Sequence, residues 1–170
     1  TVDLSSLQEV ALLAPPRYFK EPQVSGYCGF SKNLGLGYLA GVLRDHGIRV
    51  SVLDAFAEGI DTFVPVDRPN GRVYRCGLSA EVILGRLSPS ARWLGINVPF
   101  SNVAEIAFDL VRALKARFPG VPVMIYINSY ADAKAESDVC CTSANAPAIA
   151  AALPGDRVLF VPDILFAQNL

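Results

Sequence analysis

The sequence predicts an α/β protein with a doubly wound parallel sheet of five or six strands in a three-layer α/β/α arrangement. Short apolar runs alternate with helical patterns along the chain, which is typical of strands joined by crossover helices. The runs are apolar almost throughout, as in strands covered on both faces. With 170 residues, 52% of them hydrophobic, the chain is long enough to bury a core without disulfides or metals.

The expected strands cover residues 10–14, 49–53, 93–98, 122–127, 138–141 and 157–161. The expected helices cover 34–46, 78–87, 102–118 and 145–153, with one or two turns at 131–137. Gly47 is the stop of the first helix. Asn102 is a candidate N-cap, with Glu105 three residues later, and Pro119-Gly120 ends that helix. Segments 15–33 and 56–77 lack both patterns and are expected to be irregular.

Charge and composition exclude several functions. Lys and Arg number 15 against 16 Asp and Glu, so a sequence-independent nucleic-acid binder is not expected. No uncharged apolar run reaches the length of a membrane span, and the N-terminus lacks the basic and apolar regions of a signal peptide. The sequence therefore predicts a cytoplasmic protein without a membrane or nucleic-acid partner.

The cysteines predict reduced thiols, not a metal site. They lie at positions 28, 76, 140 and 141, with no C-x-x-C spacing. The single histidine, His46, argues against a zinc site and a Ser-His-Asp triad. We predict no catalytic residue and no metal ligand from these patterns.

Ligands of open α/β sheets bind beyond the carboxyl ends of the strands. Ser101, with Asn102, follows the third expected strand there, and Thr142 and Ser143 follow the fifth. Hydroxyls and free backbone N–H groups before a helix suit a carboxylate or phosphate. The same residue types also cap helices, so both interpretations stay open at both places.

Two further features have an ordinary and a functional interpretation. Gly35-Leu36-Gly37 matches the first three positions of the G-x-G-x-x-G motif that binds dinucleotides, but it does not follow a strand directly, as that motif requires. Small residues that allow close helix–sheet packing are the alternative. Asp54 ends the second expected strand, where it either binds a ribose or caps the next turn.

Residues 10–118 resemble the cobalamin-binding domain of radical S-adenosylmethionine enzymes. The resemblance is carried by VALLAPP at 10–16, LGLGYLA at 34–40, the segment 44–54 and LGINVPFS at 94–101. It implies a flavodoxin-like fold that holds a corrinoid at the carboxyl edge of the sheet. The sequence has no D-x-H-x-x-G motif, so the corrinoid would have no lower histidine ligand.

From about residue 112 to 163 the chain resembles quinolinate synthase. The motifs are PGVPV at 119–123, YINS at 126–129, KAESD at 134–138, CTSANA at 141–146 and FVPD at 160–163. The resemblance implies that Tyr126, Asn128 and Ser143 line a pocket for dihydroxyacetone phosphate and the quinolinate carboxylates. The family carries a 4Fe–4S cluster on three cysteines from three homologous domains, and the neighbours of the cysteines here do not match its motifs.

The two resemblances meet near residue 115 within one expected α/β domain of residues 1–170. The main functional hypothesis is a recombined or engineered chimera, a flavodoxin-like scaffold without a complete active site. Tyr126, Asn128, Thr142, Ser143 and Ser101 are its candidate ligand residues, for a small anion or cobalamin bound weakly. A natural chain with both resemblances is the other origin considered. The alternative function is a quinolinate synthase-like 4Fe–4S enzyme fragment of NAD biosynthesis. Under the main hypothesis, we do not expect a 4Fe–4S cluster.

Overall fold

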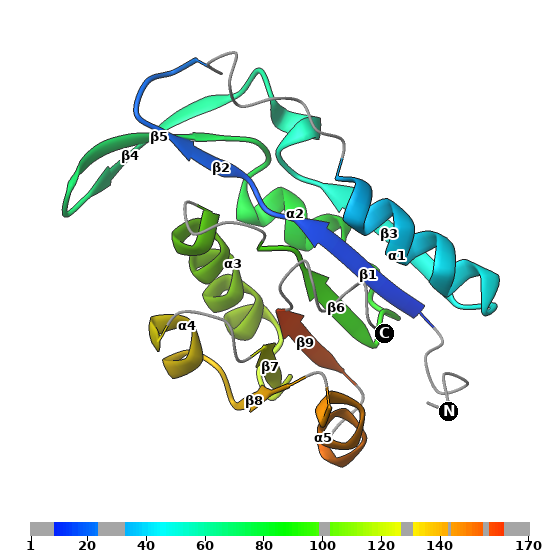
Figure 1. The fold of residues 1–170 in the computed structure, drawn as a ribbon. Coiled ribbons are helices and arrows are strands. Elements are labelled where there is room, and N and C mark those ends of the chain that lie inside the picture. Colours follow the sequence, from blue (N-terminus) through cyan, green and yellow to red (C-terminus); the bar gives the residue numbers. More distant parts are fainter. Residues whose placement is uncertain are drawn as a thin grey trace.

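The computed structural model describes residues 9–23, 33–98, 103–126, 131–142, 144–154 and 157–161. A six-stranded parallel sheet forms its centre (Figure 1). Its strands are β1 (Glu9–Ala14), β3 (Arg49–Asp54), β6 (Trp93–Ile96), β7 (Val123–Tyr126), β8 (Val139–Cys141) and β9 (Val158–Val161). They coincide with the six apolar runs, so the predicted α/β fold class is confirmed.

The order of the strands is β3-β1-β6-β9-β7-β8. Strand β9, which comes last in sequence among the strands of this sheet, therefore lies between the third and fourth, and pairs with β6 on one side and β7 on the other. The sheet consists of two groups of three strands that are consecutive in the sequence of this sheet, β1, β3 and β6, then β7, β8 and β9. In each group the first strand lies in the middle: β1 between β3 and β6, and β7 between β8 and β9. The two groups meet where β6 pairs with β9.

Five helices flank this sheet: α1 (Leu34–Asp45), α2 (Ala80–Arg86), α3 (Ala104–Arg117), α4 (Ala131–Ala135) and α5 (Ala146–Ala152). The buried residues of α2 and α3 pack on one face, whereas those of α1 and α5 pack on the other. Gly47 ends α1 with a positive φ of 77°, as a C-terminal glycine is expected to do. No helix within the described ranges has the length and apolar character needed to cross a bilayer.

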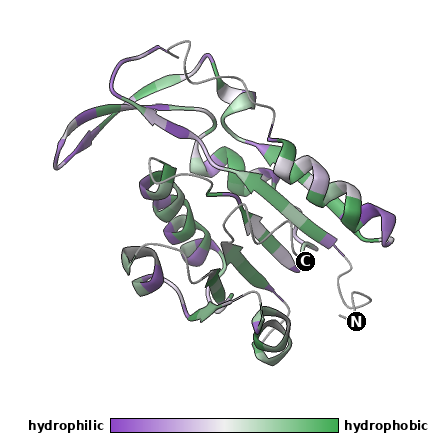
Figure 2. Cartoon of the chain, viewed as in Figure 1, coloured by the Kyte–Doolittle hydropathy of each residue, from purple (hydrophilic) through white to green (hydrophobic). Residues whose placement is uncertain are grey.

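The largest buried cluster joins the two halves of the chain. It includes Leu13 and Ile96 from the first half and Leu110, Val123 and Leu159 from the second, all 3% exposed or less. Strands β1 and β9 are coloured mainly as hydrophobic in Figure 2, as expected of strands covered on both faces. The helix α3, which connects β6 to β7, therefore packs on strands from both groups.

A second, three-stranded sheet corrects the expectation that segments 15–33 and 56–77 are irregular. It has the order β2-β5-β4 and is antiparallel, with β2 (Arg17–Phe19), β4 (Phe63–Arg68) and β5 (Gly71–Cys76). A short 3-10 helix, η2 (Ala57–Gly59), precedes β4. Pro69 and Asn70 form the two-residue loop of the hairpin, and Gly71 has a φ of 112°. In Figure 1 this sheet lies beyond the arrowhead of β1, past the carboxyl end of that strand.

Candidate functional site

Four of the five predicted ligand residues belong to β7 or follow β7 and β8, and these two strands end side by side. These strands pair in parallel, with Tyr126 opposite Cys141. Tyr126 is the last residue of β7, and Thr142 is the first residue after β8. The two strand ends that carry most of the predicted ligand residues are therefore paired in parallel. Asn128 and Ser143 follow the same two strand ends but lie outside the described residues.

Thr142 takes part in a tight turn between β8 and α5. Its backbone N–H and its hydroxyl both donate to Oδ1 of Asn145, at 2.7 and 3.1 Å. Its carbonyl oxygen accepts the N–H groups of Asn145 and Ala146, at 3.3 and 3.0 Å. Both donors of Thr142 are used within the turn, which supports a structural role for this residue. An anion at this edge would instead depend on the residues around Thr142.

The predicted cap of the long helix is different in the structure. The helix α3 begins at Ala104, and Val103 occupies the cap position without a side-chain hydrogen bond. Glu105, expected to complete a capping box, instead lies 3.5 Å from Nε of Arg68. Ser101 and Asn102 lie outside the described residues, so their predicted anion contact stays a prediction.

A buried asparagine side chain lies at the carboxyl ends of β1 and β6, and it was not predicted from the sequence. Asn97 is 5% exposed, and its side chain donates to Oδ1 of Asn33 at 2.8 Å. Its backbone N–H donates to the carbonyl of Leu13 at 2.8 Å. Asn97 therefore ties the end of β6 to the start of α1. The available signal was a polar residue within an otherwise apolar run.

The interpretation of the glycine motif as a packing contact is wrong for Gly37. Gly35 and Gly37 lie inside α1, not in a loop directly after a strand. A methyl group added at Gly37 would meet no atom within 4 Å, so this glycine does not allow a close contact. Asp54 has the capping role, because its Oδ1 accepts the backbone N–H of Ala57 at 3.0 Å.

The described cysteines do not fit an iron–sulfur cluster. Cys76 and Cys141 are buried, whereas Cys140 is exposed. The Cys76 thiol donates to the carbonyl of Ile60 at 3.1 Å, and burial raises its pKa. Burial also raises the pKa of Cys141 to about 11, which opposes the thiolate that a metal ligand requires. Across the described ranges, no three His, Cys, Asp or Glu side chains gather as a metal site would need. Cys28 lies outside them.

A group of charged and polar side chains links the second sheet to α3, and no sequence pattern predicted this group. Arg68 of β4 donates hydrogen bonds to the Tyr18 hydroxyl and to Asp109 of α3. The Tyr18 hydroxyl also donates to Oδ2 of Asp109, at 3.0 Å. We call Tyr18, Arg68, Glu105 and Asp109 the Arg68 cluster. It holds the three-stranded sheet against the N-terminal half of α3.

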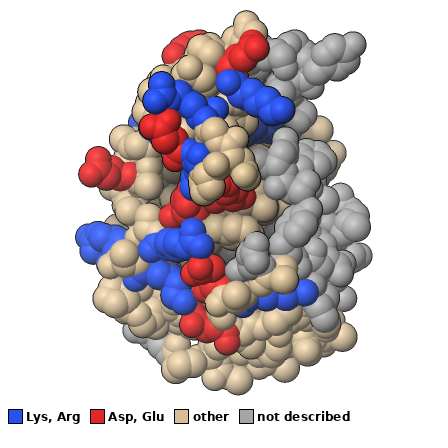
Figure 3. All heavy atoms as spheres, turned by 90° about the vertical axis from the view of Figure 1, so that its left-hand side faces the viewer, with Lys and Arg blue, Asp and Glu red and all other residues tan. Residues whose placement is uncertain are grey.

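Further ion pairs continue along α3 toward the C-terminal half of the chain. Arg112 pairs with Glu136 at 2.8 Å, and Lys115 pairs with Asp138 at 3.3 Å. Side chains of both charges lie close together over this face in Figure 3. Asp138 also accepts the backbone N–H of Val123 at 2.8 Å. The segment that connects α4 to β8 is thereby held against α3 and β7.

Comparison with known proteins relates the C-terminal part of the chain to one enzyme family. The model of the family described as Quinolinate synthetase A protein matches residues 101–170. Quinolinate synthase of Dehalococcoides mccartyi (strain 195) is 60% identical over 53 residues, which are 31% of this chain and 18% of that protein. Quinolinate synthase of Sinorhizobium medicae is 53% identical over 60 residues, 35% of this chain and 17% of that protein. Quinolinate synthase of Alkaliphilus metalliredigens is 46% identical over 72 residues, which are 42% of this chain and 22% of that protein.

The matched segment thus spans about a fifth of the length of these relatives. No solved structure matches the chain significantly. The matches contradict the main functional hypothesis, a chimeric scaffold without a complete active site, and favour the quinolinate synthase-like alternative. They give no support to the cobalamin-binding resemblance of residues 10–118. In its C-terminal part, therefore, this chain is similar to quinolinate synthase.

Proposed function

We propose that the C-terminal part of this chain is the quinolinate-binding portion of a quinolinate synthase-like enzyme. The observation that carries the proposal is the family match over residues 101–170, which includes the ends of both β7 and β8. Quinolinate is a pyridine that carries two adjacent carboxylates. Its recognition therefore requires several hydrogen-bond donors directed at one place.

The residues that would supply these donors follow two paired strands. The Tyr126 hydroxyl, the Asn128 amide and the Ser143 hydroxyl are all donors to carboxylate oxygens. Because Tyr126 lies opposite Cys141 in the parallel register, β7 and β8 end side by side. Thr142, whose donors Asn145 accepts, orients the segment that carries Ser143 instead of binding the ligand itself.

The proposal assigns substrate binding to these residues and no step to an iron–sulfur cluster. Buried thiols with raised pKa values are poor ligands for such a cluster. Any further groups that the complete reaction requires would come from outside the described part of the chain. The matched segment is a small fraction of each relative, which agrees with a pocket that this segment lines only in part.

Calorimetric titration of the whole chain with quinolinate tests the proposal. We expect saturable binding that Ser143→Ala and Asn128→Ala each weaken about tenfold, the effect of losing one hydrogen bond to a charged group. Ser51→Ala, at an exposed position on the edge strand β3, is the matched control and should bind as the parent does. Nicotinate, which lacks one carboxylate, should bind more weakly than quinolinate.

Two results would contradict the proposal. One is the absence of saturable quinolinate binding by a chain that circular dichroism shows to be folded. The other is an equal affinity in the Ser143→Ala and Ser51→Ala variants. Equal affinities for quinolinate and nicotinate would show that the second carboxylate is not recognised.

A further inference from the structure

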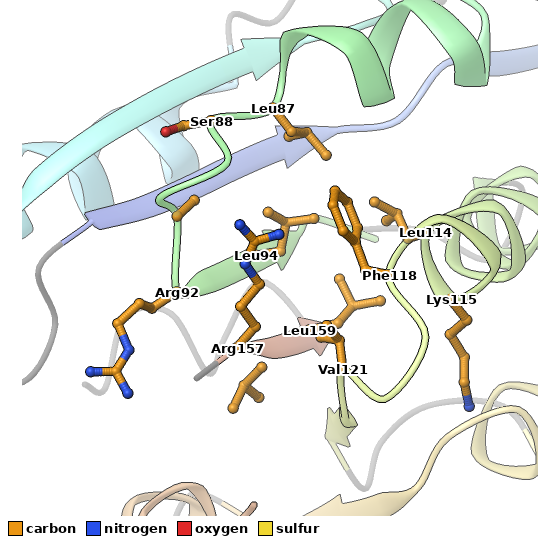
Figure 4. Close-up of a pocket in the computed structure, with 12 residues that line it drawn as sticks. Leu87, Ser88, Arg92, Leu94, Leu114, Lys115, Phe118, Val121, Arg157 and Leu159 are labelled. Atoms are coloured by element: carbon orange, nitrogen blue, oxygen red, sulfur yellow. The ribbon is translucent and has the colours of Figure 1, made fainter. Parts of the chain in front are cut away.

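The pocket drawn in Figure 4, beside Phe118, has room for little more than a water molecule. Its free volume is about 20 Å³. Leu114 and Leu159, which line it, are 3% and 2% exposed and belong to the largest buried cluster. This pocket is therefore a gap in the packing of the core, and a more unusual feature lies on the outside of the protein, on α1.

One face of α1 exposes large apolar side chains to solvent. Leu34, Tyr38 and Val42 are 65%, 77% and 51% exposed, and their spacing of four residues places them on the same face of the helix. The opposite face packs through Leu36 and Ala40 against strands β1 and β3 of the main sheet (Figure 1). Half of the six large hydrophobic side chains that are exposed in the described part of the chain therefore belong to this one helix.

Two glycines lie beside the exposed apolar side chains, and no contact within the described chain requires them. Gly37 and Gly41 are about one turn apart in α1, and both are exposed. A methyl group added at either position would meet no atom within 4 Å. Glycine destabilises the interior of a helix relative to alanine, but it allows another backbone to approach closely. This surface of α1 is therefore suited to contact with a second helix.

The charges at the two ends of α1 favour an antiparallel neighbour. Asp45, the last residue, is exposed and pairs with no cation among the described residues, and a carboxylate is unfavourable at the negative end of the helix dipole. Arg44, beside it, donates to the carbonyl of Val50 at 3.1 Å. The first turn has no acidic residue, and Oδ1 of Asn33 accepts the Asn97 amide instead of capping the helix. An antiparallel neighbour would bring a carboxylate to the end that lacks one.

We propose that α1 pairs with α1 of a second copy of this chain, antiparallel and about a twofold axis. Full overlap of the two helices places Asp45 beside the first turn of the second copy's helix, where the N–H groups attract a carboxylate. The same overlap places Tyr38 level with Gly41 of the second copy, and Val42 level with Gly37. These two large side chains thus lie beside residues that have none, which allows the helices to pack closely.

The size of this face predicts a weak association. A helix of 12 residues is about 18 Å long, so two copies in contact bury less than the roughly 1,600 Å² of a standard protein interface. We therefore expect a dissociation constant on the order of 100 μM. The helix α1 lies outside residues 101–170, which match the enzyme family, so this contact is separate from the proposed quinolinate site and does not depend on it.

Sedimentation equilibrium of the whole chain, from about 10 μM to about 1 mM and with a reductant present, tests the proposal. We expect a reversible monomer–dimer equilibrium that Val42→Lys weakens at least about tenfold, because it places a charge in an apolar contact. Val82→Lys is the matched control, because Val82 is also a helical valine, 40% exposed, but lies on α2. This control should dimerise as the parent chain does.

Two further variants separate association from folding. Gly41→Gln adds a side chain that meets open space in one copy but would lie between the helices of two. It should keep or raise the Tm of the dilute protein and weaken association at least about tenfold. Asp45→Asn removes a charge that is unfavourable at the end of its own helix. It should therefore not lower the Tm, but it should weaken association at least about twofold.

Three results would overturn the proposal. The chain could stay monomeric over the whole concentration range, which would assign the exposed face of α1 to a different partner. Val42→Lys and Val82→Lys could dimerise equally, which would place the contact elsewhere on the surface. Gly41→Gln could dimerise as the parent chain does, which would exclude close packing of the two helices. Loss of quinolinate binding in a chain that still dimerises would affect only the proposed function.

Discussion

Replacing Arg68 by methionine should loosen the attachment of the three-stranded sheet to α3. The Arg68 side chain is 20% exposed and donates to both Tyr18 and Asp109. A hydrogen bond to a charged group contributes about 1.5–3 kcal/mol. Asp109 is 36% exposed and keeps a second cation, Arg112, at 3.5 Å, so we take the lower part of that range. The expected loss is about 1–2 kcal/mol.

Amide hydrogen exchange at residues 63–76 measures this loss, because it reports the opening of β4 and β5. A loss of 1–2 kcal/mol corresponds to exchange about five- to thirtyfold faster. Urea unfolding, followed by fluorescence of the single tryptophan, Trp93 in β6, shows whether the main sheet is also affected.

The matched control is Arg72→Met on the same hairpin. Arg72 pairs with Asp67 at 2.8 Å, but their side chains are 61% and 77% exposed. Such a pair contributes at most about 1 kcal/mol. If Arg72→Met accelerates exchange at residues 63–76 as much as Arg68→Met does, the Arg68 cluster does not hold this sheet in place.

Three further predictions concern glycines, thiols and acid. Gly77→Ala should destabilise the protein by at least about 2 kcal/mol in urea unfolding, because φ is 117° and the new Cβ would lie 2.6 Å from a carbonyl oxygen. Gly41→Ala, inside α1 with no atom within 4 Å, should instead stabilise it by about 0.5–1 kcal/mol. In a Cys28→Ser background at pH 8, iodoacetamide should label exposed Cys140 far faster than buried Cys141, as mass spectrometry would show; equal rates would contradict the burial. Arg112 lowers the pKa of Glu136, so the stability from this pair is present above the unfolded pKa and is lost as pH falls through the folded value. Glu136→Gln should flatten this acid limb of a pH–stability curve, and an unchanged curve would contradict the pairing.

The local elements of the main sheet could be predicted because their sequence signals are strong. Strand β1 is buried at five of its six positions, and its sequence is therefore apolar at these positions. The helix α3 buries residues at helical spacing, including Ile106, Leu110 and Leu114. The place of β9 between β6 and β7 has no such local signal. It follows from long-range packing, because α3 must cover strands from both groups.

The three-stranded sheet was missed for a different reason. Its strands are short or partly exposed, and β4 contains Pro65 and alternates apolar with polar positions only weakly. A usable signal did exist in Pro69-Asn70-Gly71, a turn sequence between two runs that contain valine. The sheet is held by the Arg68 cluster, in which Asp109 contacts Arg68 and Tyr18, 41 and 91 residues away in the chain. Contacts at such separation leave no periodic pattern in the sequence.

The pairing of these strands could be predicted from the sequence, but the role of every residue at their ends could not. The parallel pairing of β7 with β8 could be expected from their order along the chain. The use of both Thr142 donors by Asn145 could not, because a Thr-Ser pair before a helix has the same appearance in a cap and in an anion site. The burial of Asn97 could not be predicted either, because an asparagine within an apolar run has the same appearance whether its side chain is buried or exposed.

Mapping backbone amide shifts while quinolinate is titrated into the isotopically labelled chain tests the central claim most directly. The account predicts saturable shifts centred on residues 126–130 and 142–145, at the carboxyl ends of β7 and β8. The same shifts should require about tenfold more quinolinate in Ser143→Ala and be unchanged in Ser51→Ala. Shifts confined to residues outside these two segments, or no shifts at all, would contradict it.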